Sequence, residues 1–133
     1  MSLITRRMFV GTVSLSAVGA VTSCMSQQTS KPALSHHVFF WLKNADSEQD
    51  RAKLIEGIRS LAAIETVREL HVGIPASTEK REVVDNSYSV SELLFFDDVE
   101  GQNIYQEHPV HKKFVENYSH LWERVVVYDT IAV

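Results

Sequence analysis

Aromatic and β-branched residues dominate residues 35–43 (SHHVFFWLK), which is the composition of a β-strand. Successive side chains of a strand point to opposite faces. One face therefore carries His37, Phe39 and Trp41. The other face carries His36, Val38, Phe40 and Leu42. Both faces hold large apolar side chains, so we expect something to cover each of them.

The apolar period changes from two to that of a helix in residues 44–64 (NADSEQDRAKLIEGIRSLAAI). Ser47, with Asp50 three residues later, forms a capping box at the start of this segment. A single apolar stripe follows at helical spacing, made of Leu54, Ile55, Ile58, Leu61 and Ala62. The pattern predicts an amphipathic helix that begins after Ser47.

Three further stretches have the short apolar runs of strands, at residues 66–74, 87–96 and 124–133. Residues 75–86 between the first two are polar and begin with Pro75, so we expect a connection without regular structure. In the 87–96 strand, alternation places one set of residues on a common face: Tyr88, Val90, Glu92, Leu94 and Phe96.

A proline interrupts the remaining helical segment, at YQEHPVHKKF (residues 105–114). Proline disfavours helical geometry in the residue before it and fits the first turn of a helix itself. A helix capped by Asp97 or Asp98 should therefore end near residue 107, and a second should begin at Pro109. His108 is then the joint, and His111 lies in the first turn of the second helix. The second helix has this apolar face: Val110, Phe114, Val115, Tyr118, Leu121 and Trp122.

The predicted order of elements is strand, helix, strand, strand, helix, strand. This is the ferredoxin-like β-α-β-β-α-β arrangement of the α+β class, with a four-stranded antiparallel sheet and both helices on one face. Phe39, Trp41, Leu94 and Phe96 cannot all point to the layer under the helices. The second face of the sheet therefore needs a cover, and a second copy of the chain is the simplest one. We expect a homodimer.

The first 33 residues lack the pattern of a folded domain. Paired arginines (Arg6 and Arg7) precede a short apolar run that ends in VTSC, at Cys24. This order is typical of a bacterial signal peptide of the twin-arginine type joined to a lipoprotein cleavage box. We expect residues 1–23 to be removed, Cys24 to be lipidated, residues 24–33 to be a tether and residues 34–133 to be the domain. An uncleaved helix and the general export route are the alternatives.

Charge and cysteine content narrow the possible partners. The net charge of −4 becomes −6 when Arg6 and Arg7 are removed, so we expect no nucleic-acid partner. Cys24 is the only cysteine, which excludes a disulfide within one chain, and its lipid would be the link to a membrane. We expect a protein of the bacterial cell envelope, facing the periplasm or the outside, with no cofactor.

Three segments carry a resemblance to a known family: HHVFFWLK, YQEHPVH and LWERVVVYD. Together they make residues 35–133 similar to the stress-responsive A/B barrel (Dabb) domains of the dimeric α/β-barrel superfamily. The resemblance implies two ferredoxin-like protomers packed sheet against sheet, and a stress-related role.

One branch of this family, olivetolic acid cyclase, closes a linear polyketide by an aldol-type condensation. The resemblance to it makes Tyr105 and His111 the catalytic pair and His37 a pocket histidine. It also implies these pocket walls: Phe39, Trp41, Leu94, Trp122, Val125 and Val127. An aldol closure needs a base for an acidic carbon and a donor for the carbonyl oxygen, and a histidine and a tyrosine supply both.

This chain departs from the cyclase at two pocket positions. Val90 replaces a histidine, and Glu92 replaces an apolar residue. A carboxylate in an apolar cavity has a raised pKa or pairs with a histidine, so Glu92 would select a more polar ligand. A strand bulge that turns Glu92 to solvent is the alternative. Trp41 is bulkier than its counterpart and would fill part of the cavity.

Three functions remain open at this point. The first is a stress-related dimer that binds a small, partly apolar ligand. The second is an enzyme that uses His111 as general base and Tyr105 as donor for a cyclisation or isomerisation. The third is a solid-cored dimer with an envelope protein as partner, in which YQEHPVH only builds a corner. A metal site at His36, His37, His108 and His111 is a further alternative, whereas His71 and His120 are expected at the surface.

Overall fold

The computed structural model describes residues 31–133 of the chain. The predicted signal peptide, the predicted lipidation site at Cys24 and most of the predicted tether lie outside the described residues. The elements, in chain order, are β1 (Leu34–Leu42), α1 (Glu48–Ser60), the 3₁₀ turn η1 (Leu61–Ala63), β2 (Glu69–Gly73), β3 (Val90–Phe96), α2 (Val99–Glu107), α3 (Pro109–Tyr118), the 3₁₀ turn η2 (Ser119–Leu121) and β4 (Trp122–Ile131).

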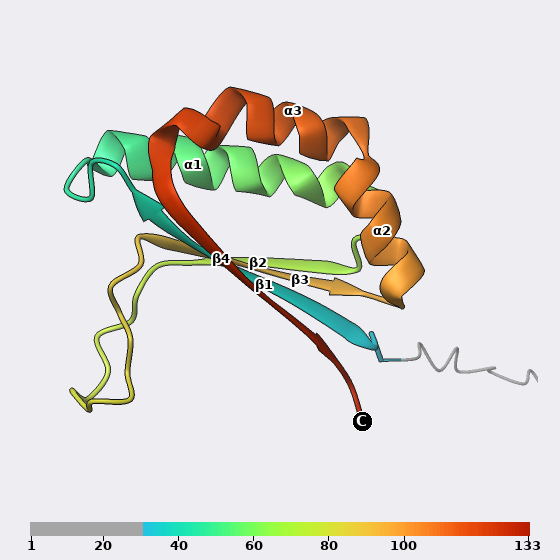
Figure 1. Ribbon diagram of the computed structural model, residues 1–133, viewed down its shortest axis with the longest axis horizontal. Coiled ribbons are helices and arrows are strands. Elements are labelled where there is room, and N and C mark those ends of the chain that lie inside the picture. Colours follow the sequence, from blue (N-terminus) through green and yellow to red (C-terminus); the bar gives the residue numbers. More distant parts are fainter. Residues whose placement is uncertain (1–30) are drawn as a thin grey trace, which may run out of the picture.

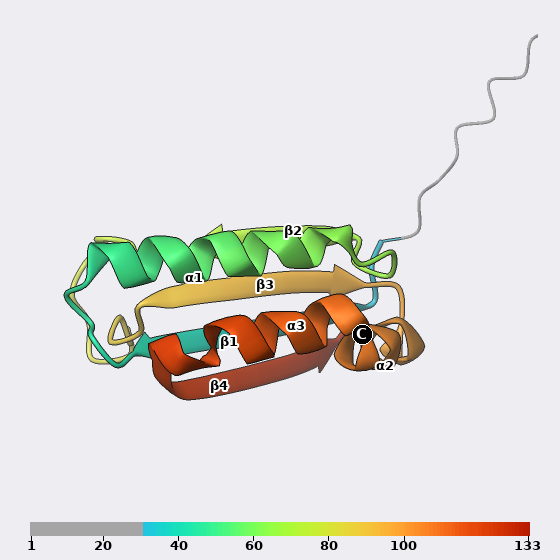
Figure 2. The same ribbon diagram turned by 90° about the horizontal axis from the view of Figure 1, so that it is seen from above.

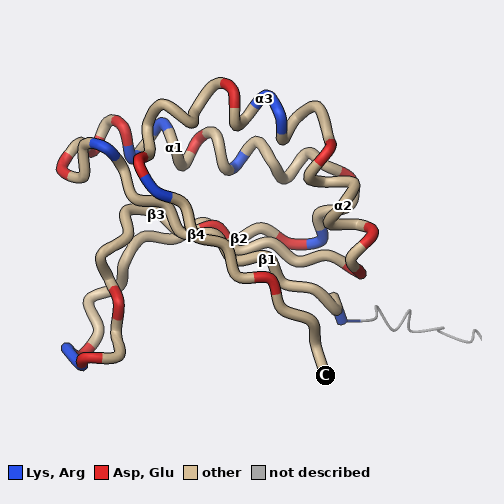
Figure 3. Tube along the Cα trace, in the orientation of Figure 1, with Lys and Arg blue, Asp and Glu red and all other residues tan. Residues whose placement is uncertain are grey.

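The four strands form one antiparallel sheet in the order β2-β3-β1-β4. Helices α1 and α3 lie side by side across one face of this sheet, and α2 lies at one end of it (Figures 1 and 2). The predicted ferredoxin-like α+β fold is confirmed. Charged positions gather on the helices and on the connection between β2 and β3, while the strands are mostly uncharged (Figure 3).

The alternation predicted for the first strand is confirmed. In β1, Leu34, His36, Val38, Phe40 and Leu42 are buried, and the residues between them are only partly covered. The buried set faces the helices, where the core also includes Leu54, Ile58, Leu61, Leu94 and Phe96. The intervening set, with His37, Phe39 and Trp41, lies on the face that the helices leave open.

The boundaries of three strands differ from the prediction. β3 begins at Val90 instead of residue 87, because the Asp85 carboxylate accepts hydrogen bonds from the backbone and hydroxyl of Ser87 and holds that residue in a turn. β2 begins at Glu69, three residues later than predicted, and β4 begins at Trp122, two residues earlier. Trp122 joins the ladder opposite Leu42 through a register shift in the β1–β4 pair.

The first helix begins as predicted. Ser47 is its N-cap, and its hydroxyl accepts a hydrogen bond from the backbone N–H of Asp50. Leu54 and Ile58 are buried, but Ala62 is exposed. The chain tightens from an α-helix to a 3₁₀ turn at residue 61, and this rotates Ala62 off the buried stripe. None of the helices within residues 31–133 is long and apolar enough to cross a membrane.

The predicted corner at Pro109 is also confirmed. Helix α2 ends at Glu107, α3 begins at Pro109, and His108 caps both. The Nδ1 atom of His108 accepts a hydrogen bond from the backbone N–H of Val110, and its Nε2 atom lies 3.2 Å from the carboxylate of Glu65. At the other end of α2, the Asp98 side chain is the N-cap. This corner sets the position of both helices over the sheet.

Candidate functional site

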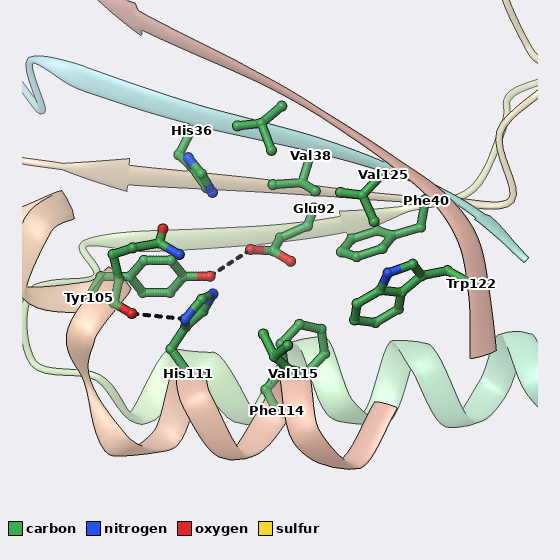
Figure 4. A pocket seen from close by; sticks show the side chains of 12 residues that line it. His36, Val38, Phe40, Glu92, Tyr105, His111, Phe114, Val115, Trp122 and Val125 are labelled. Carbon is green, nitrogen blue, oxygen red and sulfur yellow. Dashed lines mark hydrogen bonds between the residues drawn. The ribbon is translucent and has the colours of Figure 1, made fainter. Parts of the chain in front are cut away.

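A cavity of about 190 Å³ lies between the sheet and helices α2 and α3 (Figure 4). Most of its wall is apolar and comes from Val38, Phe40, Phe114, Val115, Trp122, Val125 and Val127. The remaining wall is polar and comes from His36, Glu92, Tyr105, Gln106 and His111. Val115 of α3 and Val125 and Val127 of β4 are each about 40% exposed, so the mouth of the cavity lies between these two elements.

Glu92 projects from β3 toward the helices and is 1% exposed. One of its carboxylate oxygens accepts a hydrogen bond from the Tyr105 hydroxyl at 3.0 Å. Within residues 31–133, no basic side chain forms a salt bridge with it. Burial raises the pKa of Glu92 to about 7, although the hydrogen bond from Tyr105 lowers it in part. The carboxyl group therefore changes its charge near neutral pH.

The alternative in which Glu92 points to solvent is wrong. Glu92 lies opposite Val38 of β1 and Val72 of β2, and both ladders run through it without a register shift. Strand alternation therefore fixes the carboxyl group on the same face as Val38.

Tyr105 comes from α2 and is also 1% exposed. Burial raises the pKa of its phenol, and the nearby Glu92 raises it further, so the hydroxyl stays protonated. A phenol has one proton to donate. When Glu92 is ionised, the hydroxyl group donates this proton in its hydrogen bond to the carboxylate. When Glu92 is protonated, the carboxyl group can donate to the phenol oxygen instead, and the Tyr105 proton is free for a ligand.

His111 comes from the first turn of α3, and its ring centroid lies 4.7 Å from that of Tyr105. Its Nδ1 atom is 3.1 Å from the backbone carbonyl oxygen of Gln106. A carbonyl only accepts, so Nδ1 carries a proton in this bond, and Nε2 has the lone pair in the neutral ring. Burial lowers the pKa of His111, which favours the neutral form. His111 thus offers an acceptor beside Tyr105 and Glu92 (Figure 4).

His36 is another polar residue of the cavity wall, and sequence reasoning did not assign it to the pocket. It is buried on β1, with its ring centroid 5.7 Å from that of Tyr105. Its Nδ1 atom is 2.5 Å from a carboxylate oxygen of Asp129, the residue opposite it on β4. A proton on Nδ1 in this bond leaves Nε2 as the acceptor of the neutral ring. The strand alternation carried the signal, because it already placed His36 with Val38 and Phe40.

The structure brings most of the predicted site residues to one place. Tyr105, His111, Glu92, Trp122, Val125 and Val127 all line the cavity. His37, Phe39 and Trp41 do not line it, and their predicted place in this pocket is corrected. They alternate with His36, Val38 and Phe40 along β1 and so lie on the opposite face of the sheet. Leu94 is fully buried in the core and does not line the cavity either.

The predicted surface histidines and the metal alternative can also be placed. His71 and His120 are exposed. In the described part of the chain, no three His, Cys, Asp or Glu side chains are grouped so as to hold a metal ion. His36 and His37, two of the four histidines of the predicted metal site, point to opposite faces of the sheet and cannot bind the same ion within one chain.

Solved structures from several organisms are similar to this chain. A Dabb family protein with a ferredoxin-like fold from Mesorhizobium loti superposes with a TM-score of 0.62 and 21% identity over 77% of this chain and 99% of that one. A dimeric ferredoxin-like protein of unknown function from Thermobifida fusca gives 0.61 and 17% over 76% and 92%. A hydroxynitrile lyase from Passiflora edulis gives 0.64 and 19% over 77% and 94%. At these identities the similarity establishes the fold alone.

The sequence comparison identifies the family. No curated protein sequence matches the chain significantly. Residues 34–132, however, match the profile of the Stress responsive A/B Barrel Domain, and this match spans the four strands and the three helices α1, α2 and α3. The chain therefore belongs to the stress-responsive A/B barrel (Dabb) family.

Proposed function

We propose that this Dabb domain binds a small, partly apolar molecule in the cavity between its sheet and helices. The observation that carries the proposal is an apolar pocket with a few convergent polar groups, which is the usual composition of a ligand site. The cavity volume of about 190 Å³ limits the size of the ligand. An engineered cavity of about 150 Å³ accepts benzene, so this one suits a single substituted ring or a short chain.

Closing the mouth of the cavity tests this proposal. Val125→Phe places a larger side chain at the mouth, where Val125 is 38% exposed and the core is not strained. Val83→Phe, at an 83% exposed position of the β2–β3 connection, is the matched control. Thermal unfolding is followed with phenols, β-keto compounds, short fatty carboxylates and small primary amines. A ligand at 100 times its Kd stabilises the native state by about 2.7 kcal/mol. We expect stabilisation of the native protein and Val83→Phe, and none of Val125→Phe. Stabilisation of all three, or of none, would contradict the proposal.

Acid–base catalysis is the second candidate, and the arrangement of Glu92, Tyr105 and His111 favours it. In the neutral ring, Nε2 of His111 is suited to accept a proton from a substrate. Tyr105 is suited to donate to a developing oxyanion, but only when Glu92 is protonated or displaced, because its proton otherwise goes to the carboxylate. A polyketide-cyclase type of closure uses such a pair. The hydroxynitrile lyase of similar fold also supports an enzymatic role.

The enzymatic candidate has a separate test. On a substrate found through the ligand panel, kcat should collapse in both His111→Ala and Tyr105→Phe while far-UV and near-UV circular dichroism stay native. Full activity in both variants would exclude the assignment. Retained binding with no turnover by the native protein would leave the binding function alone.

We also propose that two copies of the chain pair through the open face of the sheet. No helix within residues 31–133 covers that face (Figure 1), and it carries His37, Phe39, Trp41 and the 60% exposed Tyr128. Related structures from Thermobifida fusca and Bacteroides fragilis are described as dimeric. Sedimentation equilibrium should give twice the chain mass for the native protein. It should give the chain mass for Phe39→Asp, which buries a charge in such an interface. A monomeric native protein would refute the dimer.

The export of this protein and its attachment to the cell envelope through a lipid on Cys24 remain proposals that rest on the sequence of residues 1–24. Mass spectrometry of the protein from bacterial membranes should find an N-terminal lipidated Cys24. Cys24→Ala should remove the lipid and the membrane association. Recovery of an intact N-terminus from native cells would contradict both proposals.

A further inference from the structure

The polar end of the cavity consists mainly of hydrogen-bond acceptors. The backbone carbonyl of Gln106 occupies the Nδ1–H of His111, and the Asp129 carboxylate occupies the Nδ1–H of His36. With Nδ1 occupied in this way, an imidazole in its neutral form presents only a lone pair on Nε2 to a ligand. The Tyr105 hydroxyl donates its hydrogen bond to Glu92, so the phenol oxygen also offers only lone pairs to a ligand. An ionised Glu92 adds a carboxylate oxygen.

These acceptors converge on one region. The rings of His36 and His111 lie on either side of Tyr105, with centroids 5.7 Å and 4.7 Å from the phenol ring. Glu92 is bonded to the same hydroxyl group, and all four side chains point toward the interior of the cavity (Figure 4). A ligand group that fits here donates several hydrogen bonds from one atom. A hydroxyl group donates one, whereas a protonated primary amine donates three.

The charge of the Glu92 carboxylate also favours an ammonium group as the ligand. Glu92 has no cationic partner within residues 31–133, and a buried carboxylate without one is costly. The apolar wall includes three aromatic side chains, Phe40, Phe114 and Trp122, which pack against one another at ring-centroid distances of 5.0 to 6.4 Å. Aromatic faces attract cations and also accommodate an apolar body. An anionic ligand would meet a carboxylate and acceptor atoms instead.

We propose that the cavity selects a small primary amine in its ammonium form, with its charge beside Glu92, Tyr105 and His111 and its apolar body against Phe40 and Trp122. The proposal rests on the ligand-binding function above and names the class of ligand. The volume of about 190 Å³ sets the size of the body at about one ring.

The selection depends on pH in a defined direction. The titratable groups that face Glu92 are Tyr105 from α2, His111 from α3 and His36 from β1, with Asp129 of β4 behind His36. β2 presents Val72 there, and α1 buries the apolar residues Leu54 and Ile58. Ammonium binding needs an ionised Glu92, and the neutral form of His111 that burial favours offers the acceptor beside it. Its affinity should therefore rise from pH 6 to pH 8, and binding near pH 6 should release a proton from the protein.

Isothermal titration calorimetry with three ligands of nearly equal shape tests the proposal. Benzylamine carries a cation, benzyl alcohol is neutral and benzoate carries an anion. At pH 8, benzylamine should bind the protein at least tenfold more tightly than benzyl alcohol, and benzoate should bind least. Glu92→Gln should remove the tenfold preference for benzylamine over benzyl alcohol. Glu116→Gln, which removes an exposed carboxylate of α3, should keep the preference.

The outcomes separate this inference from the proposed function. Benzyl alcohol or benzoate binding as tightly as benzylamine, with loss in Val125→Phe, would overturn the amine selection and leave the ligand-binding function in place. Benzylamine binding that Glu92→Gln does not weaken would also overturn the selection, because the amine would then lie elsewhere. The pH dependence in the unmodified protein is an independent check, since an affinity that falls from pH 6 to pH 8 contradicts the proposal without any variant. Failure of all three ligands and of the wider panel would overturn both.

Discussion

Replacing Glu92 by glutamine should change how the stability of the protein depends on pH. Burial raises the pKa of Glu92 from 4.5 to about 7 in the folded state. A raised native pKa of a carboxyl group means that the native state is most stable below the unfolded pKa. Stability is then lost as pH rises through the native value. Glutamine does not titrate, and its amide oxygen can still accept the hydrogen bond from Tyr105.

The magnitude follows from the pKa change. One pKa unit corresponds to about 1.4 kcal/mol, so the ionised carboxylate costs the native state about 3 kcal/mol in total. Part of this cost is already present at pH 5, which leaves about 2.5 kcal/mol between pH 5 and pH 8.5. The stability of Glu92→Gln relative to the native protein should therefore increase by about 2.5 kcal/mol over this range.

Urea unfolding at one protein concentration, at pH 5, 6, 7 and 8.5, measures this difference, because the stability of an oligomer depends on concentration. Glu116→Gln is the control, and its stability should stay parallel to that of the native protein. A Glu92→Gln curve that also stays parallel, within about 0.5 kcal/mol, would refute the reasoning. It would show that Glu92 is solvated or already paired with a cation.

Three further predictions concern residues of helices α1, α2 and α3. Tyr105→Phe removes the hydrogen bond that lowers the pKa of Glu92. Urea unfolding at pH 8 should therefore show a free energy of unfolding that is about 1–3 kcal/mol lower than that of the native protein. An unchanged urea midpoint would contradict this prediction. Gly57→Ala should lower the thermal midpoint although alanine favours helices. The new Cβ would lie 2.7 Å from the Tyr118 ring, an overpacking that costs about 1–3 kcal/mol, and a raised midpoint would disprove this contact. Burial disfavours the His111 cation, so an NMR titration should give this imidazole a pKa below its usual 6.5. The stability that the neutral ring contributes is present above pH 6.5 and is lost as pH falls from 6.5 through the lower folded pKa. A pKa above 6.5 would contradict the burial of His111.

The sequence predicted the elements because their signals are local. Alternation identified β1 and its two faces, Ser47 identified the start of α1, and Pro109 identified the α2–α3 corner. Ala62 shows the limit of such reasoning, because a helical stripe assumes that the helix continues, and here the chain tightens into a 3₁₀ turn.

The site was predictable only in part, because its geometry depends on strand register. His36 and Asp129 are 93 positions apart and meet only because β1 and β4 pair in one particular register. For the same reason the sequence alone allows two orientations of Glu92, and the unbroken β3 ladders decide between them. The resemblance placed His37 in the pocket, although the alternation of β1 grouped His36 with the helix-facing residues. The physical pattern was the better guide at that position.

The most direct measurement of the central claim follows the His111 imidazole by NMR while benzylamine, benzyl alcohol, benzoate and phenol are titrated in turn. The exposed His120 serves as an internal reference. If the cavity is a binding site, at least one of these molecules should shift the His111 resonances with saturation, leave those of His120 in place and lose its effect in Val125→Phe. If none of them shifts His111, or if His120 moves as much, the cavity is not the ligand site that this structure supports.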